Sequence, residues 1–79
     1  MHVRAELGVY PFRSGETLPP PVEAEIAELR KAGLDIQIEP LGIIVTGDSD
    51  ILLGALPRAL KAALDAGGTR IALSLEVVE

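Results

Sequence analysis

Cysteine is absent from this sequence of 79 residues, and aromatic residues are scarce. Without cysteine the chain forms no disulfide and no cysteine-ligated zinc or iron–sulfur site. Tyr10 and Phe12 are the only aromatic residues, so the core has to be built from Leu, Ile, Val and Ala. The single histidine, His2, stands at the amino terminus, where no serine is placed to form a catalytic triad with it. The sequence therefore predicts a protein that is not an enzyme and holds no metal and no cofactor.

Concentrated positive charge and a long apolar run are missing as well. Seven Lys and Arg are scattered among twelve Asp and Glu, and the formal net charge is −5. A nucleic-acid-binding surface requires a basic stripe, so that class of protein is excluded. No apolar run approaches the roughly 18 residues of a membrane span, and no apolar signal core follows the amino terminus. We expect a cytoplasmic protein with no nucleic-acid partner and no membrane insertion.

The remaining composition is that of an ordinary globular protein, with 48% hydrophobic and 24% charged residues. A chain of this length makes one domain, which we place over residues 1–79. Such a small core gives marginal stability, and small domains often gain stability by associating with copies of themselves. We therefore expect a homo-oligomer.

The first half of the chain predicts a strand and a helix. Residues 2–10 alternate between apolar and polar side chains, which is the period of a half-buried strand. Pro11 ends this strand, and a loop follows over 12–17. Three prolines at 19–21 open a helix of about 12 residues, since proline is tolerated in the first helical turn. Its apolar stripe is Val22, Ile26 and Leu29, and Gly33 is its expected cap.

The second half predicts a hairpin, a second helix and a last strand. Residues 35–39 and 43–46 form the hairpin, with Ile36 and Ile38 facing inward. Asp48, Ser49 and Asp50 are typical helix-start residues, which is the preferred interpretation of that acidic pair. The helix carries a proline at 57, so we expect a kink there or a helix that begins near it. Its repeating leucines and the inward face of the final strand 70–78 complete the core: Leu53, Leu56, Leu60, Leu64, Ile71, Leu73, Leu75 and Val77.

The order β-α-β-β-α-β is typical of the ferredoxin-like α+β fold. Right-handed crossovers then give a four-stranded antiparallel sheet in the order 4-1-3-2, with two helices on one face. The other sheet face stays open. On it, strands one and four bring Glu6, Gly8 and Tyr10 close to Arg70 and Ser74, and the small residues there predict a shallow depression. Whether Ile43 and Val45 or Ile44 and Thr46 look outward from strand three stays open.

Glu6 admits two interpretations. A carboxylate in mid-strand is either a charge paired with a neighbour such as Arg4, or a group that recognises a ligand. Strand four raises a separate possibility, because it is long, apolar and at the edge of the sheet, where it invites pairing with another chain. We expect self-association through strand four and the open sheet face, as a dimer or tetramer.

Four segments together resemble the YkoF-like thiamine-binding family, and their spacings cover nearly the whole chain. They are Ala5–Pro11, Leu29–Leu34, Pro40-Leu41-Gly42 followed by Gly47-Asp48, and Gly67–Ile71. The resemblance implies a ferredoxin-like fold, assembly into dimers or tetramers, and binding of thiamine or its hydroxymethylpyrimidine part without catalysis.

The resemblance also implies roles for particular residues. Glu6 would accept a hydrogen bond from the exocyclic amine of an aminopyrimidine, Ser74 would bond a ring nitrogen, and Tyr10 would cover the ring face. Gly8 leaves room for the ring, and Ile43 stands where the family usually has Thr after Pro-Met-Gly. The alternative function is an oligomeric scaffold or regulatory interaction domain with no small ligand. Calorimetric titration with thiamine separates the two.

Overall fold

The structure, a computed structural model, describes residues 1–10 and 18–78. The loop expected at 12–17, and Pro11 before it, lie outside the described residues. The elements follow the predicted order, and they are β1 (His2–Tyr10), α1 (Pro20–Lys31), β2 (Asp35–Glu39), β3 (Gly42–Asp48), α2 (Ser49–Asp65) and β4 (Arg70–Val77).

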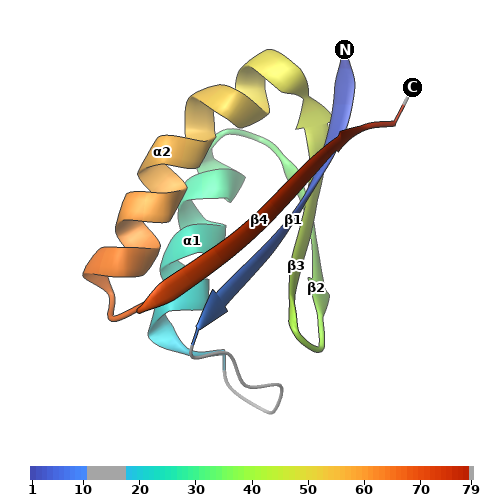
Figure 1. Ribbon diagram of the computed structural model, residues 1–79. Coiled ribbons are helices and arrows are strands. Elements are labelled where there is room, and N and C mark those ends of the chain that lie inside the picture. Colours follow the sequence, from blue (N-terminus) through green and yellow to red (C-terminus); the bar gives the residue numbers. More distant parts are fainter. Residues whose placement is uncertain (11–17, 79) are drawn as a thin grey trace.

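The sheet has four antiparallel strands in the order β2-β3-β1-β4, which confirms the ferredoxin-like prediction. Both helices lie side by side on one face, and no helix formed by residues 1–10 and 18–78 covers the other face (Figure 1). β1 pairs along most of its length with β3 on one side and with β4 on the other, so that Glu6 lies between Ile44 and Ser74. This central strand therefore fixes what stands on each face of the sheet.

Capping residues define both helices as the sequence predicts. α1 begins with prolines in its first turn, and Gly33 beyond its end adopts a φ of +80°, a conformation that glycine reaches at little cost. The side chain of Asp48 accepts a hydrogen bond of 3.0 Å from the backbone N–H of Asp50. The acidic pair is therefore a helix start, and Asp48 serves as the N-cap of α2.

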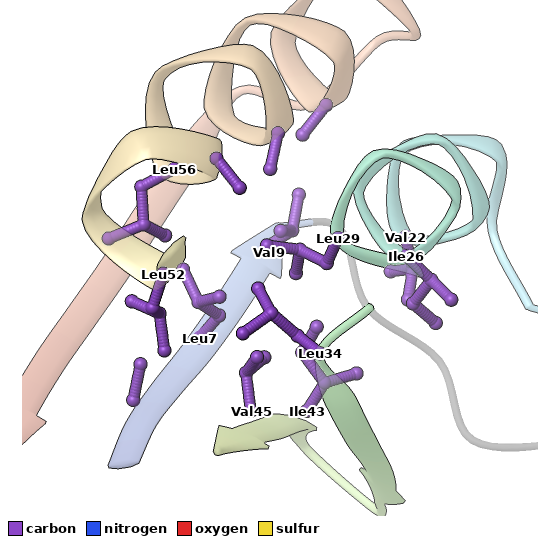
Figure 2. Close-up of a cluster of buried hydrophobic side chains, with 14 of the residues drawn as sticks. Leu7, Val9, Val22, Ile26, Leu29, Leu34, Ile43, Val45, Leu52 and Leu56 are labelled. Atoms are coloured by element: carbon purple, nitrogen blue, oxygen red, sulfur yellow. The ribbon is translucent and has the colours of Figure 1, made fainter. Parts of the chain in front are cut away.

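The core lies between the helices and the strands β1 and β3 (Figure 2). Alternate residues of β1 face the helices, and Leu7 and Val9 are only 2% and 1% exposed. The predicted stripe of α1 is confirmed, and Leu29 at its centre is fully buried. The predicted inward orientation of Ile36 and Ile38 is confirmed, since they pair with the buried residues Val45 and Ile43. Ile36 packs against the core, whereas Ile38 is 47% exposed. β2 lies at the sheet edge, where the helices reach only part of it.

α2 is a single helix that contains Pro57. Its buried face consists mainly of small side chains, and the predicted leucine stripe is wrong in part: Leu53 and Leu64 are each 51% exposed. The residues that face the core are Leu52, Ala55, Leu56, Ala59 and Ala63. Alanines let α2 approach its neighbours closely. Of the predicted stripe, Leu56 is buried and Leu60 packs against the core, whereas Leu53 and Leu64 lie on the flank of the helix.

β4 contributes little to the core, which is the main correction to the sequence analysis. Ile71 packs against the core, but Leu73, Leu75 and Val77 are between 44% and 55% exposed. These side chains do share the helix-side face, because Leu73 pairs with Leu7 and Leu75 with Ala5. They stay exposed because the helices pack over β1 and β3 and leave β4 uncovered.

Among the described residues, Glu25 of α1 is the one charged residue that is buried. Its side chain is 0% exposed, and within residues 1–10 and 18–78 neither carboxylate oxygen has a hydrogen-bond partner. Glu28 lies one turn further on, where Nζ of Lys31 is 2.8 Å from its Oε2 and the charge of Arg58 on α2 also acts on it. Burial raises the pKa of Glu25 from 4.5 to about 7.

We expect the stability of the protein to fall as the pH rises, because of Glu25. Its folded pKa lies above its unfolded value, so the stabilisation is complete below about pH 4.5 and is lost as the pH passes about 7. A difference of this size corresponds to about 3 kcal/mol in the free energy of unfolding. Urea unfolding at a series of pH values measures it. Glu25→Gln should remove this loss, and Glu23→Gln, on the exposed side of α1, should keep it; a loss that survives Glu25→Gln would contradict the assignment.

Candidate functional site

The open sheet face is built from alternate residues of three strands. Glu6 and Gly8 of β1 project from it, because Leu7 between them is buried on the other face. Ser74 and Ala72 of β4 pair with Glu6 and Gly8 and therefore share that face. The predicted neighbourhood of Glu6, Gly8 and Ser74 is thus present in the fold.

The orientation of β3, which the sequence left open, is settled by the structure. Ile43 and Val45 are 2% and 0% exposed and face the helices, so Ile44 and Thr46 look outward. The side chain of Ile43 accordingly belongs to the core, and the open face receives its backbone only. Ile44, which pairs with Glu6, takes the outward place beside the predicted site.

These residues line a depression with a volume of about 540 Å³. Its floor is formed by β3, β1 and β4, and its wall on one side is the β2–β3 hairpin. Leu41, at the tip of that hairpin, is 82% exposed, so the wall is apolar. The lining residues are Glu6, Leu7, Gly8, Glu39, Pro40, Leu41, Gly42, Ile43, Ile44, Ala72, Leu73 and Ser74.

Tyr10 stands at the margin of the depression. Its ring leans over Gly8, since a Cβ atom added at Gly8 would lie 3.8 Å from both Cε2 and Oη of the tyrosine. The guanidinium of Arg70 lies 4.9 Å from the ring centroid, a cation–π contact. Tyr10 is 42% exposed and is outside the lining itself. It therefore forms a rim next to Gly8, close to the place where a flat ring would lie.

Arg4 joins two carboxylates on the open face. Its Nη2 lies 2.9 Å from Oε1 of Glu6, and its Nε lies 3.2 Å from Oε1 of Glu76. One of the two interpretations of Glu6, a charge paired with Arg4, is therefore present in the structure. All three side chains are 40% to 59% exposed, so these pairs contribute little to stability. A carboxylate has about four acceptor sites, so Glu6 can accept from a ligand while it holds Arg4.

The lining carries two carboxylates, Glu6 and Glu39, and no lysine or arginine among its described residues. Gln37 donates a hydrogen bond of 2.8 Å to Oε2 of Glu39 and so orients it. An apolar floor with acidic groups at its margin suits a flat, positively charged or amine-bearing molecule. The shape and the charge of the depression therefore favour a small cationic ring as ligand.

Glu39, Leu41 and Ile44 were missed by the sequence analysis. A signal for Ile44 exists, because Thr46 is the one polar residue in the run 43–46 and marks the even positions as outward. No comparable signal exists for Leu41, whose place depends on how the hairpin folds back. The backbone carbonyl of Leu41 lies 3.7 Å from the position of a Cβ at Gly8, a contact between distant parts of the chain.

The fold and this depression define the protein as a ferredoxin-like α+β domain with an acidic ligand-sized site on its open sheet face. The chain belongs to the family described as thiamine-binding protein, whose model matches residues 5–79. This confirms the resemblance drawn from the sequence. No curated protein gives a significant match.

Several solved structures are similar to this chain. A Streptococcus pneumoniae protein has a TM-score of 0.78 at 22% identity, covering 100% of this chain and 89% of that one. A hypothetical protein from Methanocaldococcus jannascii has a TM-score of 0.69 at 27% identity, with coverage of 99% and 79%. A Thermotoga maritima protein, named for a proposed role in thiamine biosynthesis or salvage, has a TM-score of 0.66 at 16% identity, with coverage of 96% and 81%.

No helix formed by the described residues is long and apolar enough to cross a membrane. No group of three or more His, Cys, Asp or Glu side chains in residues 1–10 and 18–78 is placed to hold a metal ion.

Substitution by alanine should affect the stability of the protein differently at two glycines of the site. At Gly8 a Cβ meets only ordinary contacts near 3.7 Å, so Gly8→Ala should change the free energy of unfolding by no more than about 0.5 kcal/mol. At Gly42 a Cβ would collide with the backbone carbonyl oxygen of Leu7, so Gly42→Ala should cost about 1–3 kcal/mol. Urea unfolding of both variants measures this, and equal stabilities would contradict the described packing of the hairpin on β1.

Proposed function

We propose that this protein binds thiamine, or the hydroxymethylpyrimidine part of thiamine, in the depression on its open sheet face and releases it unchanged. The observation that carries the proposal is the position of Glu6 in that depression, between Ile44 and Ser74. Membership of the thiamine-binding family supports the choice of ligand. The molecule would act as a cytoplasmic carrier or sensor and would need no cofactor.

The chemistry of an aminopyrimidine fits the groups around Glu6. Its exocyclic amine is a hydrogen-bond donor, which a carboxylate accepts, and its ring nitrogen is an acceptor, which the hydroxyl of Ser74 can serve. Gly8 and Ala72 leave the floor between them flat, so the ring can lie on the sheet. Tyr10 then borders the ring from the side of Gly8.

Thiamine also carries a positive charge on its second ring. Glu39 supplies a second negative group within the same lining, and the formal net charge of −5 favours the approach of a cation. Gly42 and Ile43 also line the depression, and because the side chain of Ile43 belongs to the core, its contribution comes from the backbone. The two carboxylates thus provide one anionic group for each end of a two-ring ligand.

Glu6→Gln should weaken the binding of thiamine or hydroxymethylpyrimidine without unfolding the protein. The charge-assisted hydrogen bond is worth roughly 1.5–3 kcal/mol, so the dissociation constant should rise by about one to two powers of ten. Isothermal titration calorimetry measures the affinity, and urea unfolding confirms that stability changes by no more than about 1 kcal/mol.

The matched control is Asp35→Asn. Asp35 pairs with Thr46 and so stands on the same sheet face, but it is outside the lining of the depression. It changes the net charge as Glu6→Gln does, so an equal loss of affinity in both variants would assign the effect to general charge.

Absence of heat with either ligand, from a folded wild-type sample at high micromolar concentration, would overturn the proposal and favour a scaffold without a small ligand. Mass spectrometry of the recovered ligand should show an unaltered mass.

A further inference from the structure

Glu39 faces the depression from the side opposite Glu6, with β3 between them. It is the last residue of β2 and pairs with Gly42, whereas Glu6 of β1 pairs with Ile44. Neighbouring strands are about 4.8 Å apart, so the two glutamate backbones are at least about 10 Å apart across the sheet. A Cβ atom added at Gly42 would lie 3.5 Å from Cα of Gly8, so no side chain separates Glu39 from the floor there. The two carboxylates therefore border one open floor.

The negative charge of Glu39 has no compensating cation in the described chain. Its Oε2 accepts a hydrogen bond of 2.8 Å from the neutral amide of Gln37, which holds the carboxylate in place. The charge of Glu6, in contrast, is shared with Arg4 at 2.9 Å. No lysine or arginine within residues 1–10 and 18–78 forms an ion pair with Glu39 or lines the depression. Glu39 therefore contributes most of the negative potential on its side of the depression.

The chemistry of thiamine connects this charge to phosphorylation. With the aminopyrimidine at Glu6, the positively charged second ring lies toward Glu39. That second ring carries the alcohol of thiamine, and the alcohol is the group that is esterified in thiamine monophosphate. A phosphate ester carries a charge of about −1.5 to −2 at pH 7. Phosphorylation would therefore bring a second negative group next to Glu39, and like charges brought together in a binding site reduce affinity.

We propose that Glu39 makes the depression selective for the unphosphorylated ligand, because its carboxylate attracts the cationic ring of thiamine and repels the phosphate of thiamine monophosphate. This inference rests on the proposed function and names the form of the ligand that the protein holds. Phosphoryl transfer to the alcohol is accordingly the class of reaction that consumes the bound molecule, since its product no longer fits the charge of the site.

Arg70 marks the opposite margin of the site, where a phosphate would be attracted instead. Its guanidinium stacks on Tyr10 at 4.9 Å from the ring centroid, outside the lining of the depression. Two observations favour the Glu39 side for the second ring. Glu39 belongs to the lining itself, and the exposed side chain of Leu41 beside it offers an apolar contact for a ring. The hairpin of β2 and β3 that carries both residues extends along this side of the sheet (Figure 1).

Titration calorimetry with thiamine and with thiamine monophosphate measures the selectivity as the ratio of two dissociation constants. For the wild-type protein at low ionic strength, the monophosphate should bind at least about tenfold more weakly, which corresponds to about 1.4 kcal/mol. Glu39→Gln should lower this ratio to about threefold or less, and Glu39→Lys should invert it. Because salt screens exposed charges, the wild-type ratio should also shrink at about 1 M sodium chloride.

Asp35→Asn is the matched control for the Glu39 variants. Asp35 lies on the same strand and the same sheet face and loses the same charge, but it is outside the lining of the depression, so the wild-type ratio should persist. Binding of hydroxymethylpyrimidine, which lacks the second ring, reports in each variant whether the Glu6 end of the site is intact.

Two kinds of result would overturn the inference, and they are distinguishable. Equal affinity of the wild-type protein for thiamine and its monophosphate, or an unchanged ratio in Glu39→Lys, would refute the role of Glu39 and leave the proposed function standing. A preference for the monophosphate that disappears in Arg70→Gln would place the second ring at the opposite margin and refute that role as well. A folded wild-type protein that binds neither thiamine nor hydroxymethylpyrimidine would refute the proposed function, and this inference with it.

Discussion

The packing of two helices on a sheet of four strands is the constraint on which the rest of this molecule depends. Both helices close over β1 and β3, and the helix-side residues Val3, Ala5, Leu7 and Val9 are 0% to 3% exposed. Burying a Val or Leu side chain contributes roughly 1.5–3 kcal/mol, so this strand supplies much of the driving force of a small core. The layer of two helices does not extend over β4. The described residues form no second layer of helices on the outer face of the sheet.

The site is a direct consequence of the same strand. Side chains alternate across a sheet, so burial of Leu7 places Glu6 and Gly8 on the outer face, and a slip of one residue would exchange the two sets. The register that buries the core is therefore the register that assembles the site. This coupling explains how the chain holds a carboxylate at a defined place on its surface. Glu6 is positioned by its buried neighbours along β1, and Arg4 lies beside it as an exposed ion-pair partner.

Sequence patterns were sufficient for the fold and for much of the site. The alternation over 2–10 and the cap at Asp48 are local signals, and both are confirmed. The patterns failed where burial depends on distant elements. Leu73 and Leu75 alternate as core residues do, yet no helix reaches them. The leucines of α2 repeat at helical spacing, but Leu53 and Leu64 of that repeat are exposed, and three alanines face the core beside Leu52 and Leu56. The orientation of Ile43 was left open, although Thr46 alone marks the even positions of that strand as outward; its pairing with the buried Leu7 settles it.

The most direct test of the account is to locate thiamine on the sheet by amide chemical shifts in nuclear magnetic resonance. Titration with thiamine should move the signals of Glu6, Gly8, Ile44 and Ser74, which border the depression, and leave those of Val22 in α1 and Ala59 in α2 unchanged. Shifts confined to the helices, or no shift at saturating thiamine, would contradict the assignment of the open sheet face as the binding site.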